Sequence, residues 1–243
     1  MMISMIRYLL ASYTRSYRYF APLAFIIISV MLIYSYRPNP IMSSYAVTSV
    51  LLFIGSAWLG LNFFNHDQGR QSMLLIIHSG RPIRYYAAQF FTAALLSMIF
   101  SLFAVLFPVV FGMFDKPISL LEFALGYLGH VALALLGISL SVFFQFGFIE
   151  NQGRAAGLLI IIMVISLAGQ TLQQKIPSNI GFIIYVLPPV STTIDLFMHI
   201  EDRSAISTFV TILYSYLYSF ILLAIYLWTV CRKDAAALIR KVG

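Results

Sequence analysis

Long uninterrupted apolar runs constrain this chain more than any other feature of its sequence. Hydrophobic residues make up 61% of it and charged residues only 9%, whereas soluble domains carry about 25% charged residues. A helix needs about 20 apolar residues to cross the hydrocarbon core of a bilayer, and runs near this length recur along the chain. Because the runs are continuous rather than alternating, they predict membrane helices and not the strands of a barrel. We therefore expect an all-α, polytopic membrane protein with one transmembrane domain over residues 1–243.

Polar interruptions between the runs delimit six predicted transmembrane spans. In residues 1–19, which precede the first span, an apolar and a basic helical face predict an amphipathic helix at the membrane interface. Small residues four apart, Ser56 with Gly60 and Gly137 with Ser141, predict faces on which helices pack closely. The predicted spans are residues 20–36, 45–64, 86–114, 123–149, 155–172 and 205–230.

The segment at residues 174–204 contains only a short apolar stretch, residues 180–187, which is too short to be a span. Its apolar stretch ends at Pro188 and Pro189, which a helix does not continue through. Thr192 and Asp195 then have the spacing of a capping box, which predicts the start of a short helix. We expect a re-entrant or interfacial pair of short extracellular helices before the last span.

Lysine and arginine are divided unequally between the two sets of polar segments. If both termini lie on one side, eleven of the fifteen basic residues fall on that side and four on the other. Because an excess of basic residues marks cytoplasmic segments, we expect a multi-pass protein of the cell membrane with both termini and residues 65–85 in the cytoplasm. This distribution also accounts for the net charge of +7, so we expect no nucleic-acid partner.

The sequence lacks the motifs of ATP-binding proteins, of zinc enzymes and of ion-coupled carriers. It has neither a phosphate-binding P-loop pattern nor a histidine and cysteine cluster with zinc-ligand spacing. We therefore expect no enzyme activity, no metal and no cofactor in this chain. His130 lies inside the predicted fourth span, where a hydrogen bond between helices is the favoured interpretation and a proton relay the alternative. The absence of acidic residues at mid-membrane weakens an ion-coupled carrier.

Hydroxyl, amide and small side chains recur at helical spacing in several of the predicted spans. This pattern predicts hydrogen bonding between helices. The alternative is a weakly polar lining for an amphipathic substrate. The candidate pathway-lining residues are Ser56, Ser166, Gln170, Thr211 and Ser215.

Residues 65–85 form the most polar long interruption of the chain and contain a short amphipathic segment. Its apolar residues form a knob that charged residues surround, and protein interfaces combine apolar anchors with a polar rim in this way. The alternative is a helix that rests on membrane lipid, and the two roles are compatible. The candidate contact residues are Asp67, Arg70, Met73, Leu74, Ile76, Ile77, His78, Arg81 and Arg84.

The order of these features resembles the ABC-2 type permease family, the membrane subunits of one class of ABC exporters. An amphipathic helix precedes the first span, two short helices broken at Pro188 and Pro189 precede the last, and the length is that of one six-span half. In residues 65–85 an acid, a glycine, leucines, a proline, an arginine and an aromatic follow in the family's order. The residues in that order are Asp67, Gly69, Leu74, Leu75, Pro82, Arg84, Tyr85 and Tyr86.

The resemblance implies that residues 65–85 form a coupling helix, which docks on a separate ATPase subunit present in two copies. ATP and Mg would be bound by that subunit. A second permease half would complete a homodimer or heterodimer, with the second and fifth spans as walls of the pathway. The implied function is export of an amphipathic or hydrophobic substrate, such as a peptide, an antibiotic or a lipid-like molecule. The alternatives are a stand-alone secondary carrier or channel and a membrane-embedded enzyme.

Overall fold

The computed structural model describes residues 2–66, 70–145, 147–175 and 186–242, and these residues are almost entirely helical. No β-strand occurs among them, so the expected all-α class is confirmed. Two 3-10 helices, η1 (Val142–Phe144) and η3 (Ile200–Asp202), follow α6 and α10. The α-helices are α1 (Met2–Arg15), α2 (Phe20–Ile33), α3 (Ile41–Phe64), α4 (Arg70–Ser79), α5 (Pro82–Val110), α6 (Leu120–Ser141), α7 (Gln152–Leu167), α8 (Gly169–Lys175), α10 (Val190–Met198) and α11 (Ala205–Val242).

Four of these helices, α3, α5, α6 with η1, and α11, are long and apolar enough to cross a membrane. The number rises to six if α1 with α2 and α7 with α8 each count as one bent span. The helices are thus those of a multi-pass membrane protein.

Two predicted spans differ from the expectation because their helices end early. α2 ends at Ile33, and its axis makes an angle of 83° with that of α1. Tyr17, between these two helices, has a φ of +58°, a left-handed backbone that cannot continue an α-helix. The predicted fifth span is divided at Ala168, where the axes of α7 and α8 differ by 63°.

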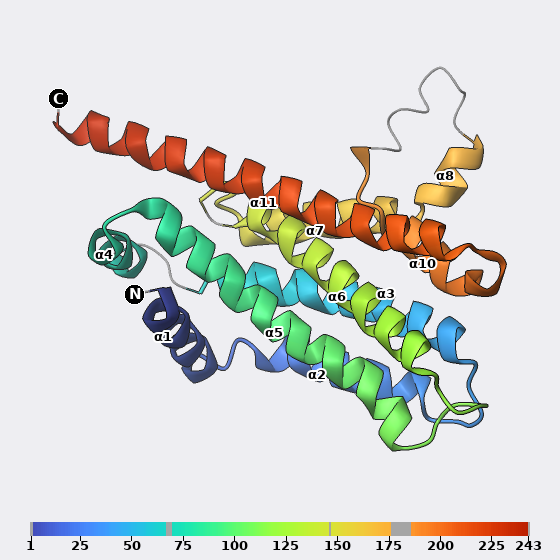
Figure 1. The fold of residues 1–243 in the computed structure, drawn as a ribbon. Helices are drawn as coiled ribbons and strands as arrows, with labels where there is room; N and C mark the ends of the chain where they lie inside the picture. Colours follow the sequence, from blue (N-terminus) through green and yellow to red (C-terminus); the bar gives the residue numbers. More distant parts are fainter. Residues whose placement is uncertain (1, 67–69, 146, 176–185, 243) are drawn as a thin grey trace.

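The contact between α3 and α6 forms the centre of the bundle, with α6 lying between α5 and α11 (Figure 1). A Cβ atom added to Gly137 of α6 would lie 2.5 Å from the carbonyl oxygen of Phe53 and 2.9 Å from the nitrogen of Ala57. Gly60 of α3 faces Ser141 of α6. The two close-packing faces predicted from small residues are confirmed, and they pack against each other.

His130 joins the same two helices inside the bundle. Its Nε2 atom lies 2.9 Å from Thr48 Oγ1 of α3, and its Nδ1 atom donates to the carbonyl oxygen of Gly126 at 2.7 Å. The aromatic rings of Tyr45 and Phe197 flank the imidazole. The predicted hydrogen bond between helices is confirmed.

The short helix before α11 differs in detail from the prediction. Its N-cap position is Pro189, which makes no capping hydrogen bond. Thr192 lies inside the helix and donates to the carbonyl oxygen of Pro189 at 2.8 Å, while Asp195 pairs with Arg203. The predicted capping box is therefore wrong, because the two prolines place the helix start before Thr192. The apolar stretch before the prolines falls largely on residues 176–185, outside the described residues.

The two ends of the bundle differ in charge. Figure 1 shows α1, α4 and the C-terminal part of α11 at one end, and the α2–α3 and α5–α6 connections with α10 at the other. The eleven basic residues predicted to share a side belong to the first end, called the basic end below. The other four belong to the second, called the far end. The fold separates the charges as the residue count predicted, and the membrane side of each end stays a prediction.

Candidate functional site

α4 is a short helix at the basic end that joins α3 to α5 through a sharp turn. Gly80 follows it with a φ of +72°, a left-handed conformation that glycine adopts without a steric penalty. Arg81 is extended, and Pro82 then occupies the first turn of α5, where a missing backbone N–H costs no helical hydrogen bond. The turn folds α4 back against the beginning of α5 (Figure 1).

Ser79 is buried in this turn and connects its two sides. Its Oγ atom lies 2.7 Å from the carbonyl oxygen of Ile76 and 3.0 Å from that of Arg81. The Arg84 guanidinium donates to the carbonyl oxygen of Ser79 at 3.4 Å. These contacts set the angle at which α4 leaves α5.

One side of α4 faces the bundle and the other is open. Leu75 and Ile76 are partly buried and pack against the apolar core at this end. Met73, Leu74 and Ile77 are 46%, 67% and 67% exposed. Ile76 was predicted as a contact residue, but it is partly buried and lies with Leu75 on the side of α4 that packs against the bundle.

Three of the other predicted contact residues lie at the C-terminal end of α4, in the turn that follows it and at the start of α5. His78, Arg81 and Arg84 are exposed. Arg70 begins the helix, although its side chain is not described, and Asp67 lies outside the described residues. The exposed residues, called the α4 face below, are Met73, Leu74, Ile77, His78, Arg81 and Arg84.

α1 is fixed to the bundle beside this site. Ser12 Oγ of α1 lies 2.9 Å from His66 Nε2, just after α3. The Arg18 guanidinium donates to the carbonyl oxygen of Asn65 at 3.0 Å. The predicted amphipathic helix therefore forms, and its apolar face packs on protein; its place at a membrane interface stays a prediction. Its buried residues are Met5, Leu9 and Tyr13.

Aromatic and amide side chains connect the start of α5 to α11 and to the end of α6. The rings of Tyr85 and Tyr86 lie 5.2 Å apart between centroids, and Tyr86 lies 6.1 Å from the ring of Tyr226. The Gln145 amide donates to the Tyr226 hydroxyl at 3.1 Å, and the Gln89 amide donates to the Tyr85 hydroxyl at 2.8 Å. Sequence reasoning missed Tyr226, whose only signal was a polar atom inside an apolar run.

A groove with a volume of about 440 Å³ lies between α3 and α7, next to the basic end. This volume is within the range of small-molecule sites, about 300–1,000 Å³. Polar and basic residues stand towards the basic end, and apolar residues form the remaining walls. The residues that define it here are Arg18, Trp58, Asn62, Gln152, Leu159 and Met163.

None of the five predicted pathway residues, all described, lines this groove. Ser56 is buried in the α3–α6 contact. Ser166 and Thr211 donate to carbonyl oxygens one turn earlier on their own helices, at 2.6 and 2.9 Å. Ser215 lies 2.8 Å from a threonine hydroxyl of α10, and Gln170 is partly exposed on α8. Hydrogen bonding and packing account for these side chains better than a shared lining does.

Family models, curated proteins and solved structures offer no match to this chain. Within the described residues, no group of three or more histidine, cysteine, aspartate or glutamate side chains could hold a metal ion.

Proposed function

We propose that the chain is the transmembrane permease subunit of an ATP-driven ABC exporter for an amphipathic or hydrophobic substrate. The observation that carries this proposal is the α4 face. α4 has ten residues, about 15 Å of helix, which is half the thickness of the hydrocarbon core. Its exposed apolar side chains therefore do not belong to a span, and they need another surface to cover them.

A protein partner suits the α4 face better than lipid alone does. Leu74 and Ile77 are the most exposed apolar side chains of the helix, and the exposed basic residues His78, Arg81 and Arg84 follow them in the chain. A docked partner would bury these anchors inside a polar rim, as stable interfaces do. The partner proposed here is a separate ATPase subunit in two copies, which binds ATP and Mg. Binding of this partner would displace α4, and the ring contact between Tyr86 of α5 and Tyr226 of α11 would transmit the displacement to α11.

The same proposal assigns the remaining parts of an exporter. The groove between α3 and α7 has apolar walls and a polar mouth, which suits an amphipathic molecule such as a peptide, an antibiotic or a lipid-like compound. A second permease half, identical or not, would face this groove. Six spans with both termini in the cytoplasm are part of the proposal, and the basic residues gathered at one end support it.

The test is co-purification with the ATPase subunit expected from the neighbouring gene, using a chain that carries both Leu74→Asp and Ile77→Asp. Burial of one leucine or isoleucine contributes about 1.5–3 kcal/mol, so the double variant should weaken the complex at least about 100-fold and abolish ATPase stimulation. Leu120→Asp is the control, because Leu120 is 84% exposed and belongs to the far end. An intact, stimulated complex with the double variant would refute the docking role. Ion-driven transport by the chain alone would instead support a carrier.

A further inference from the structure

Tyr226 of α11 is completely buried at the basic end, where α11 packs against α5 and α6 (Figure 1). Its ring centroid lies 6.1 Å from that of Tyr86 in α5, and 6.3 and 6.4 Å from those of Phe143 and Phe148. Aromatic rings about 4.5–7 Å apart attract each other in such arrangements. The Gln145 amide donates to the Tyr226 hydroxyl at 3.1 Å. Tyr226 thus connects the start of α5 to the turn between α6 and α7.

The turn between α6 and α7 is attached to α11 at a second place. The carbonyl oxygen of Gln145 accepts hydrogen bonds from the backbone N–H groups of Phe148 and Ile149, at 2.9 and 3.1 Å, and these bonds close the turn. The Lys233 ammonium of α11 donates to the carbonyl oxygen of Gly147 at 2.9 Å. It also lies 4.4 Å from the centre of the Phe148 ring, which is a cation–π contact. A movement of α11 at this level therefore moves the turn with it.

α7 follows this turn and forms one wall of the groove between α3 and α7. Its first residue, Gln152, and Ala156, one turn later, both line the groove. On its outward side, Ile161 and Val164 are 54% and 58% exposed. Because this side is open, a shift of the turn can tilt the start of α7 and change the width of the groove. α4 packs on α5, whereas α7 packs on α3, η1, α8 and α10, so a displacement of α4 passes through other elements before it reaches α7.

We propose that Tyr226 is a positioning residue that couples the α4 face to the width of the groove. Ser79 joins α4 to the start of α5, so docking on α4 displaces both, and the Tyr86 ring transfers the displacement to Tyr226. The Tyr226 hydroxyl passes it to Gln145, and the turn carries it to α7. Coupling between distant sites travels through packed side chains and hydrogen bonds of this kind. This role rests on the proposed function, because it takes the α4 face as the docking surface and the groove as the substrate site.

The first test uses the purified chain alone, in detergent, and measures access to the groove. Cys231→Ser removes the one native cysteine, and Ala156→Cys places a new thiol in the groove wall. The rate at which N-ethylmaleimide modifies this thiol reports the width of the groove. Ser79→Ala loosens α4 from α5 and should change the rate about threefold, the size expected for one hydrogen bond between membrane helices. Adding Tyr226→Phe should remove this change. No change with Ser79→Ala, or an equal change with and without Tyr226→Phe, would overturn the coupling.

Tyr216→Phe is the matched control. The Tyr216 hydroxyl also joins α11 to α6, because it donates to the carbonyl oxygen of Leu128 at 2.9 Å, but it lies nearer the far end. Tyr216→Phe should therefore leave the effect of Ser79→Ala unchanged. Gln145→Leu removes the other partner of the Tyr226 hydroxyl and should act as Tyr226→Phe does. Loss of the effect in Tyr216→Phe as well would assign it to general loosening of α11 and overturn the role of Tyr226.

The second test uses the complex with the ATPase subunit of the neighbouring gene. Binding of the subunit should change the modification rate in the Ala156→Cys chain and in its Tyr216→Phe variant, but not in its Tyr226→Phe variant. All three chains should retain the subunit. A full response in the Tyr226→Phe variant would overturn the coupling. If none of the chains binds the subunit, the proposed function fails, and the first test alone decides whether Tyr226 couples α4 to the groove.

Discussion

Replacing Gly137 by alanine tests the close contact at the centre of the bundle. The added Cβ would lie 2.5 Å from the carbonyl oxygen of Phe53 and 2.9 Å from the nitrogen of Ala57. Both are backbone atoms, so no side-chain rotation relieves the overlap, and α3 and α6 must separate. Overpacking of this kind costs about 1–3 kcal/mol, against about 1 kcal/mol of helix propensity that favours alanine over glycine. We expect a net loss of up to about 2 kcal/mol in the free energy of unfolding.

The assay is thermal unfolding of the purified chain in detergent, compared with Gly157→Ala. Gly157 lies inside α7 with no atom within 4 Å of an added Cβ, so only helix propensity changes there. For a chain of this size, 1 kcal/mol corresponds to about 2–4 °C. We therefore expect Gly137→Ala to lower the midpoint by up to about 8 °C and Gly157→Ala to leave it equal or higher. Equal stability of the two variants would refute the close approach of α3 and α6.

Three further outcomes follow from individual contacts. Gly80→Ala places a side chain at a φ of +72° with no neighbour within 4 Å, so backbone strain of about 1–2 kcal/mol should accelerate hydrogen exchange in α4; unchanged exchange would contradict the turn geometry. His130→Ala removes the bond to Thr48 and should destabilise the chain by about 1–3 kcal/mol, measured by the unfolding midpoint. Thr193→Ala and Ser215→Ala, whose hydroxyls lie 2.8 Å apart, should show a coupling of about 0.6 kcal/mol in a double-mutant cycle, and additive effects would argue against the bond.

The sequence predicted best those features that depend on composition or on residue size. Membrane helices follow from apolar content, which a bilayer selects without regard to tertiary contacts. The contact between α3 and α6 was predictable because Gly60 and Gly137 leave room for close approach of two backbones. The interhelical role of His130 was predictable because a buried imidazole needs hydrogen-bond partners.

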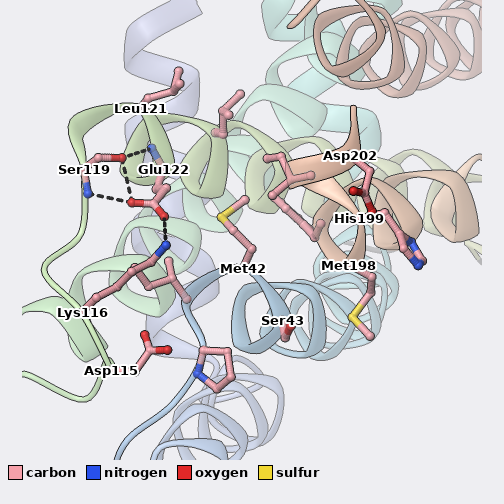
Figure 2. A pocket seen from close by; sticks show the side chains of 15 residues that line it. Met42, Ser43, Asp115, Lys116, Ser119, Leu121, Glu122, Met198, His199 and Asp202 are labelled. Atoms are coloured by element: carbon pink, nitrogen blue, oxygen red, sulfur yellow. Dashed lines mark hydrogen bonds and ion pairs between the residues drawn. The ribbon is translucent and has the colours of Figure 1, made fainter. Parts of the chain in front are cut away.

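Features that depend on neighbours were not predictable. Hydroxyl groups at helical spacing predicted hydrogen bonds between helices, with a lining as the alternative, but Ser166 and Thr211 bond to carbonyl oxygens of their own helices. The sequence pattern does not distinguish a bond within one helix from a bond between two. Ile76 belongs to an unbroken apolar run in α4, so its inward orientation is decided by packing against the bundle. The pocket at the far end shown in Figure 2 combines residues from α3, the α5–α6 connection, the start of α6, and α10 with η3, and only the folded chain brings them together.

The uneven distribution of basic residues makes the folded chain an electric dipole along its long axis. The interaction of a basic residue with the surface of an anionic leaflet is favourable by about 1 kcal/mol. Moving one elementary charge across a membrane potential of 100 mV changes the free energy by about 2.3 kcal/mol. Eleven basic residues at one end and four at the other would therefore make the two orientations unequal in an asymmetric vesicle. Reconstitution against a leaflet rich in phosphatidylserine should orient the population, without any partner protein, with its basic end towards that leaflet.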